Sequence, residues 1–214
     1  MDERRDEFLL AMYNQLLNDI NRHIMVVWQS VGVLVGAFAI LALVEKNLIS
    51  LDLAVAIVVL LCGWLCAHLI DAGYWYNRNL VMIANIERQF LLESDLRDIQ
   101  SYFGAHRPKN KMIRHLRIQF ALGVGVALLI LVFHFLIRVV PGLGASSRFD
   151  VFRTMPYVIG FVVALYCWRE KATRDEEYLA FKKTSPGKDI DTRGIVYGPG
   201  HGFPKASPPA RKDR

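Results

Sequence analysis

Long apolar blocks, almost free of charged residues, constrain this chain more than any other feature of its sequence. They cover residues 24–44, 53–72, 118–137 and 151–168, so each has 18 to 21 residues. An α-helix rises about 1.5 Å per residue, and it needs about 20 residues to cross the roughly 30 Å hydrocarbon layer of a bilayer. We therefore expect an all-α, polytopic membrane protein with four transmembrane helices in two hairpins and cytosolic helical extensions.

The composition supports this class, and one block is weaker than the others. The chain is 53% hydrophobic and only 21% charged, with a mean hydropathy of +0.26. The block at 151–168 reaches its full length only if Arg153 extends its side chain to the headgroups. Pro156 then falls in the first turns of the helix, where a missing N–H group costs least.

Lys and Arg residues are distributed unevenly over the segments between the blocks. The N-terminal, middle and C-terminal segments hold 22 of them, and the two short loops inside the hairpins hold 4. Because segments rich in Lys and Arg stay on the cytoplasmic side, we expect a multi-pass protein with both termini in the cytoplasm. Residues 1–23, which we call the leader, are acidic as well as basic, and the first apolar block is too long for a cleaved signal peptide.

The leader before the first block is amphipathic, because Phe8, Met12, Leu16 and Ile20 recur every four residues. With no helix breaker in between, we expect one helix from about residue 5 to 44. The leader either lies on the inner leaflet or packs against a partner helix. The second block also continues as a helix to about Glu93, and the leader is the nearest segment that could cover its apolar side.

The chain divides into three parts on this interpretation. Residues 1–100 hold the leader, the first hairpin and a cytosolic stalk helix, with a further helix predicted from about Ser94. Residues 101–183 hold the second hairpin with flanking helices. Residues 184–214 contain five Gly and five Pro and show no apolar period, which is typical of a disordered basic tail.

No sequence motif of a known catalytic, cofactor or metal site is present. The chain lacks the zinc-protease, nucleophile-elbow and phosphate-loop patterns, and its three cysteines have no metal-ligand spacing. We expect Cys62, Cys66 and Cys167 to be small buried apolar residues. The prediction is therefore a protein that is not an enzyme, with no catalytic, cofactor-binding or metal-binding residues, no cofactor and no direct contact with nucleic acid.

The most suggestive polar residues are His68 and Asp71, which share one face of the second block near its cytoplasmic end. Gln29 of the first block lies at a similar depth, so the three side chains could form a small polar cluster. They would either hydrogen-bond between helices or line a pore. His134 lies far from them in depth, which excludes a shared metal site.

Pairs of small residues four apart let transmembrane helices approach closely. Gly32 and Gly36 form such a pair in the first block, and Ala121 and Gly125 form another in the third. We expect these pairs to pack against helices of the same chain or of other copies in a homo-oligomer.

The order of parts in the first half resembles the SLATT domains, two-span membrane effectors of bacterial nucleotide-signalling antiviral systems. The residues that carry the resemblance are 13–22, the hairpin through Asp71, and 75–90. The second hairpin and the tail depart from the two-span plan. The resemblance implies a non-enzymatic effector of the bacterial inner membrane that oligomerises and permeabilises the bilayer on a signal from a cytosolic enzyme or sensor.

Two other classes of function compete with the effector. One is a passive membrane scaffold or accessory subunit whose stalk docks a soluble partner. The other is a small channel or transporter, although four spans without broken helices or repeats count against a transporter.

Overall fold

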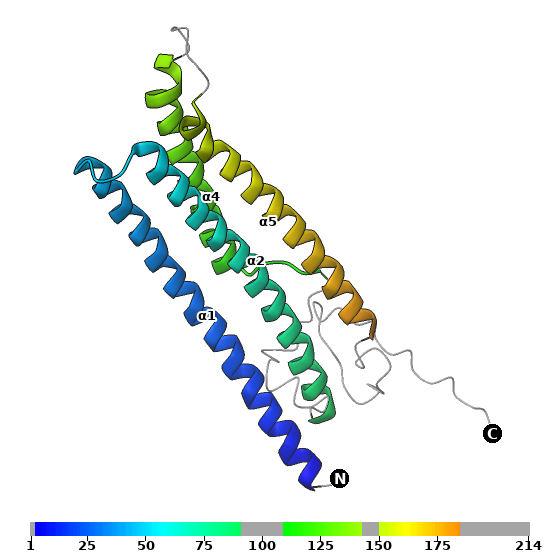
Figure 1. The fold of residues 1–214 in the computed structure, drawn as a ribbon. Coiled ribbons are helices and arrows are strands. Elements are labelled where there is room, and N and C mark those ends of the chain that lie inside the picture. The colour runs from blue at the N-terminus through cyan, green and yellow to red at the C-terminus, as the bar shows by residue number, and fades with distance from the viewer. Residues whose placement is uncertain (1–2, 91–108, 143–149, 185–214) are drawn as a thin grey trace, which may run out of the picture. The chain divides into compact units, whose positions relative to one another are not determined.

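The computed structural model describes residues 3–90, 109–142 and 150–184, and these contain helices but no strand. The elements are α1 (Glu3–Glu45), α2 (Leu51–Phe90), α4 (Arg114–His134), the π-helix η1 (Phe135–Val139), the 3-10 helix η2 (Val140–Gly142) and α5 (Val151–Thr184) (Figure 1). The all-α prediction is confirmed for this part of the chain.

The predicted helical extensions are also confirmed. The leader and the first apolar block form one helix of 43 residues, α1. Helix α2 continues past its apolar block to Phe90, and α5 continues to Thr184. The helix predicted from about Ser94, and almost all of the predicted disordered tail, lie outside the described residues.

Three elements are long and apolar enough to cross a membrane: α2, α4 together with the short turns that follow it, and α5. By the length and composition of these helices, the chain is a multi-pass membrane protein. The weak block at 151–168 belongs to one of the candidate spans, α5. The block at 24–44 lies within α1, but several of its side chains are outside the described set. Four spans in two hairpins, and the orientation of the termini, stay predictions.

Short-range signals fix where α1 ends and α2 begins. Asn47 has a φ of 55°, and the N–H groups of Asn47 and Leu48 donate to the carbonyls of Val44 and Leu43. This is the Schellman arrangement that ends many helices. Ser50 then caps α2, since its Oγ accepts a hydrogen bond of 3.2 Å from the N–H of Leu53.

The chain forms two compact units, which we describe separately. The membrane unit comprises residues 24–73 and 112–174, and the stalk unit comprises the described parts of the remaining chain. Helix α2 is the central helix of the membrane unit. Of its most apolar 18-residue stretch, 61% is buried, against 11% for α4 and 6% for α5. Its core includes Leu34 and Ala37 of α1, Cys62 and Leu65 of α2, and Leu116 of α4.

The stalk unit joins the leader to the second half of α2. Leu16 and Ile20 of α1 pack against Leu80, Ile83 and Ile86 of α2. The leader therefore covers the apolar side of the α2 extension, as one of the two sequence interpretations predicted.

Helix α5 also contributes to the core of the stalk unit, because Tyr178 is fully buried against Tyr74 and Val81 of α2. A buried polar contact supports this packing: Asn77 Nδ2 donates to Asn110 Oδ1 over 2.8 Å, and Asn110 donates to Asp175 over 3.1 Å. These bonds connect α2, the segment before α4, and α5 within the unit.

Helix α5 packs closely against α2 at Gly63. A Cβ built on Gly63 would overlap Cγ1 of Val163, whereas one on Gly125 of α4 would meet no described atom within 4 Å. We predict that Gly63→Val lowers the free energy of unfolding in detergent by about 1–3 kcal/mol, the usual cost of overpacking. Gly125→Val is the matched control, and equal stability of the two variants would contradict this packing.

Candidate functional site: two ion-pair clusters and an apolar groove

The predicted residues His68 and Asp71 lie in an open groove between α2 and α5, with a volume of about 560 Å³. Asp71 Oδ1 is 2.9 Å from Nη2 of Arg174, and Nε of Arg174 donates to Glu170 over 2.8 Å. The Asp71 cluster, as we call Asp71, Glu170, Arg174 and His68, therefore combines two carboxylates, one guanidinium and one imidazole at one end of the membrane unit.

His68 and Asp71 line this groove together but contact different groups. The His68 ring stacks on Trp64 with centroids 5.4 Å apart and planes 5° apart. Nε2 of His68 is buried and has no hydrogen-bond partner. The predicted three-residue cluster with Gln29 stays untested, because the Gln29 side chain lies outside the described set.

The small-residue pairs differ in how they are used. No described atom would lie within 4 Å of a Cβ on Gly32 or Gly36, so this pair faces open space. Gly123 of α4 instead packs closely, because a Cβ there would lie 3.3 Å from Sγ of Cys66. Helix α4 thus approaches α2 at Gly123, whereas Gly125 of the predicted pair makes no such contact within the described chain, and its packing against another copy stays a prediction.

A second polar cluster, the Asp52 cluster, lies at the opposite end of the membrane unit. Asp52 accepts two hydrogen bonds from Arg138, Nε to Oδ1 over 3.0 Å and Nη2 to Oδ2 over 2.9 Å. Nε2 of His134 lies 2.8 Å from Oδ1, and Nδ1 of His134 lies 2.9 Å from the hydroxyl of Tyr157. The cluster therefore joins α2, the α4–η1 junction and α5.

The hydrogen bonds determine the proton positions on His134. A carboxylate only accepts hydrogen bonds, so Nε2 carries the proton that faces Asp52. In the neutral imidazole, Nδ1 then accepts the proton of the Tyr157 hydroxyl. The His134 side chain is completely buried, and Asp52 is 5% exposed. Every polar atom of this buried imidazole is thus hydrogen-bonded.

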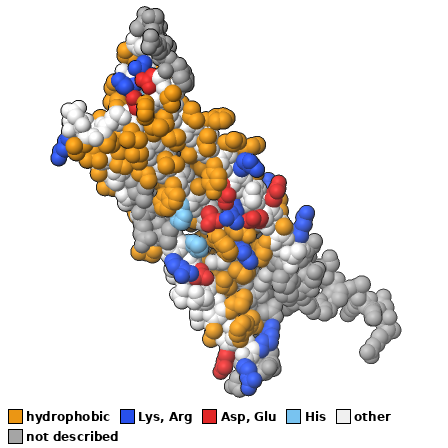
Figure 2. Space-filling view, in the orientation of Figure 1, with side chains coloured by type: hydrophobic (Ala, Val, Ile, Leu, Met, Phe, Trp, Pro, Cys, Tyr) orange, Lys and Arg blue, Asp and Glu red, His pale blue; other side chains and the backbone are white. Residues whose placement is uncertain are grey.

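The two clusters lie at opposite ends of the apolar part of α2. Asp52 and Asp71 are 19 residues apart, which corresponds to roughly 28 Å along a helix. This length is close to the ~30 Å hydrocarbon thickness of a bilayer. Figure 2 shows the same pattern on one face, where hydrophobic side chains form a belt between two groups of charged ones. Each cluster places an Asp–Arg pair at the depth expected for a membrane interface.

The sequence analysis missed Asp52, Arg138 and Tyr157. A usable signal was present, because Asp52 directly precedes the second apolar block and Arg138 directly follows the third. Opposite charges at the same predicted depth on two neighbouring spans indicate a pair. The same argument connects Asp71 with Arg174, which follows the fourth block.

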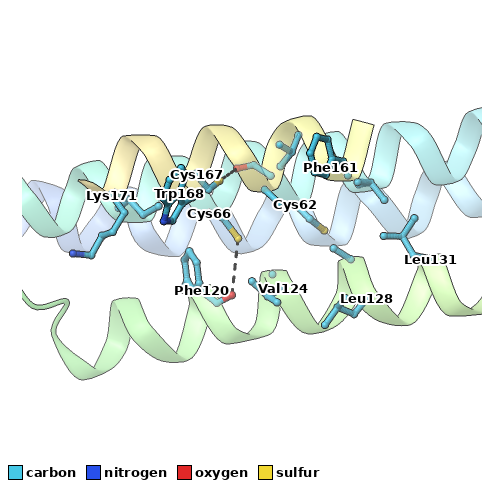
Figure 3. Close-up of a pocket in the computed structure, with 18 of the residues that line it drawn as sticks. Cys62, Cys66, Phe120, Val124, Leu128, Leu131, Phe161, Cys167, Trp168 and Lys171 are labelled. Atoms are coloured by element: carbon cyan, nitrogen blue, oxygen red, sulfur yellow. Dashed lines mark hydrogen bonds between the residues drawn. The ribbon is translucent and has the colours of Figure 1, made fainter. Parts of the chain in front are cut away.

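A third feature is an apolar groove of about 670 Å³ between α2, α4 and α5. Cys62, Cys66, Phe120, Leu131, Gly160 and Cys167 are among the residues that line it. Figure 3 shows Lys171 and Trp168 toward one end and Leu131 toward the other. Its thiols donate weakly to backbone carbonyls, Cys167 to Gly63 over 3.7 Å and Cys66 to Phe120 over 4.0 Å. All three cysteines are free. Cys62 and Cys66 are buried as predicted, whereas Cys167 is only half-buried.

The stalk unit contains a buried carboxyl group outside the apolar blocks. Oε1 of Glu87 accepts a long hydrogen bond of 3.4 Å from the hydroxyl of Tyr13, and Oε2 is buried without a partner. Burial raises the pKa of Glu87 to about 7, an effect that the Tyr13 hydrogen bond opposes. Burial, and next to it the Glu87 charge, raise the pKa of Tyr13.

These features are polar contacts and an apolar cavity, and they do not form a metal centre. Among the residues that the structure describes, no group of three or more His, Cys, Asp or Glu side chains is placed to hold a metal ion. No family model, curated protein or solved structure matches this chain.

We predict that Asp52 and Arg138 stabilise the membrane unit as a pair. Hydrogen bonds to charged groups contribute about 1.5–3 kcal/mol, so Asp52→Asn and Arg138→Gln should each lower the free energy of unfolding by about that amount. The double variant should lose less free energy of unfolding than the two single variants lose together, because neither Asp52 nor Arg138 then remains as an unpaired charge. Additive losses in this double-mutant cycle would show that the two residues act independently.

The stalk unit should be more stable at pH 5.5 than at pH 8. Glu87 has a raised pKa in the folded protein, against about 4.3 in an unfolded chain. The contribution of Glu87 to the stability of the stalk unit is therefore fully present below the pKa of the unfolded chain. It is lost as the pH rises through the folded pKa of about 7. The protection factors of residues 74–90 in hydrogen exchange, which correct for the base-catalysed intrinsic rate, should fall over this range.

Glu87→Gln should remove this pH dependence of stability and keep residues 74–90 protected from hydrogen exchange at pH 8. Glu176→Gln is a matched control, because Glu176 is exposed. If the Glu176 variant abolished the dependence and the Glu87 variant retained it, another group would be responsible.

Proposed function

We propose that this chain is a non-enzymatic effector of the bacterial inner membrane that oligomerises on a cytosolic signal and permeabilises the bilayer. The defence setting, against viruses, rests on the resemblance of residues 8–100 to the SLATT domains. The partners of the effector are the lipid bilayer, further copies of the chain, and a cytosolic signalling enzyme or sensor.

The observation that carries this proposal is the unoccupied face of α1. Trp28, Gly32, Val35 and Gly36 follow one another at helical spacing, and all four are exposed. Leu34, Ala37 and Leu41 belong to the part of α1 that contributes to the core. A small-residue pair that the described chain does not use is suited to close contact with a helix of a second copy.

The interior of the membrane unit supports assembly as a requirement for permeabilisation. The core residues around α2 are apolar, and charged side chains gather in the Asp52 and Asp71 clusters. A water-filled path through the bilayer needs polar groups or open space along its length. We therefore propose that the path forms between copies, with His68 and Asp71 at its cytoplasmic mouth.

The stalk unit is the proposed receiver of the signal. Its leader belongs to the same continuous helix as Gly32 and Gly36. A partner that displaces Leu16 and Ile20 from α2 would change the packing at one end of α1 and free the helix to associate differently. This is an equilibrium between two packings, which a partner shifts by binding one of them more tightly.

A passive scaffold or accessory subunit is the alternative, and one observation favours it. Phe8 and Leu10 of the leader are 67% and 60% exposed. In this alternative, Phe8 and Leu10 would contribute to a docking surface for a soluble partner. A scaffold of this kind would bind its partner without any change in membrane permeability.

Over-production in bacteria distinguishes the two functions. We predict that the wild-type chain depolarises the cells, measured with a voltage-sensitive dye, and stops their growth. A Gly32→Leu, Gly36→Leu variant should reduce the depolarisation about tenfold, which corresponds to about 1.4 kcal/mol of lost association.

Gly125→Leu serves as the control, because Gly125 also faces open space but lies on α4. Expression of each variant in the membrane is checked by immunoblot. Normal potential in wild-type cells, together with a stoichiometric soluble partner after purification, would contradict the effector and favour the scaffold.

A further inference from the structure

The apolar groove of the membrane unit is not explained by the proposed function. It has a volume of about 670 Å³, within the range of about 300–1,000 Å³ that is typical of ligand sites. We propose that it holds one acyl chain of an anionic phospholipid, with the headgroup beside Lys171. This inference is independent of whether the chain is an effector or a scaffold.

The length and lining of the groove suit a hydrocarbon chain. Along α5 the lining extends from Tyr157 to Lys171, a separation of 14 positions and about 21 Å by helix rise. The lining is almost entirely apolar and the groove is open on one side, so a lipid chain can enter it from the bilayer.

A glycine from each of the three helices lines the groove: Gly63 of α2, Gly123 of α4 and Gly160 of α5. A Cβ on Gly123 would lie 3.3 Å from Sγ of Cys66, and one on Gly160 would lie 3.5 Å from Leu131. These glycines therefore let the helices that form the walls of the groove pack closely.

The chemistry at one end identifies the headgroup. Lys171 and Trp168 line the same end of the groove (Figure 3). A lysine places its ammonium at the headgroups while its methylene stem stays on apolar surface, and tryptophan prefers the membrane interface. A lysine near the surface attracts anionic lipids and has no equivalent attraction for zwitterionic ones. The headgroup is therefore a phosphate-linked group of net negative charge.

The cysteines give a direct readout of occupancy in the native chain. The chain has three cysteines, all of them free, and all three line the groove. Cys62 and Cys66 are already buried by the protein, so the half-buried Cys167 carries the thiol that an acyl chain in the groove would cover. Thiol reactivity thus reports on the groove without any introduced label.

The test uses the full-length protein in nanodiscs of phosphatidylcholine alone or with added phosphatidylglycerol. We predict that native mass spectrometry finds one phosphatidylglycerol retained per chain, and that N-ethylmaleimide labels the thiols more slowly when this lipid is present. Lys171→Gln should reduce the preference for phosphatidylglycerol about fivefold, the factor expected for one lysine near a membrane surface. Lys183→Gln is the control on the same helix, because Lys183 is exposed and does not line the groove.

A second pair of variants separates groove binding from general lipid contact. Ala164→Phe should fill the groove and abolish retention, whereas Ala121→Phe on the exposed side of α4 should not. Circular dichroism confirms that both variants fold. The proposal is overturned if the thiols react at the same rate in both nanodiscs, if phosphatidylcholine is retained as well as phosphatidylglycerol, or if Ala164→Phe leaves retention unchanged.

Discussion

The pairing of Asp52 with Arg138 is the interaction on which the membrane unit depends most. A carboxylate at the end of an apolar helix is costly to bury, and an ion pair with further hydrogen bonds offsets that cost. Because Asp52, Arg138, His134 and Tyr157 come from three segments, their contacts fix the relative depth of α2, α4 and α5. Asp71 and Arg174 do the same for α2 and α5 at the other end, and the ~28 Å between the two ends matches a bilayer.

Helices and their extents could be predicted from the sequence, because block length and the four-residue period are local properties. The continuous α1, the extension of α2 and the packing of Leu16 and Ile20 on it follow from such patterns. The partners of the polar residues could not be predicted in the same way. Asp71 pairs with Arg174, which is 103 positions later, and such a contact depends on which helices are neighbours. The available signal for such a pair was that two opposite charges lie at the same predicted depth on neighbouring spans. This signal also applies to Asp52 and Arg138.

Two parts of the described apolar surface take specific assignments. The first is the small-residue face of α1 around Gly32 and Gly36, to which we assign contact between copies. The second is the groove between α2, α4 and α5, whose apolar lining ends at Lys171 and to which we assign a lipid chain.

We propose that the chain works as an assembly of several copies, because the described core of the membrane unit is apolar and offers no polar path. The oligomeric mass of the full-length protein in nanodiscs, measured by mass photometry or native mass spectrometry, tests this proposal. Our account predicts a closed ring of several copies, which the Gly32→Leu, Gly36→Leu variant converts to smaller species. A strict monomer under conditions in which the wild-type protein permeabilises membranes would contradict it.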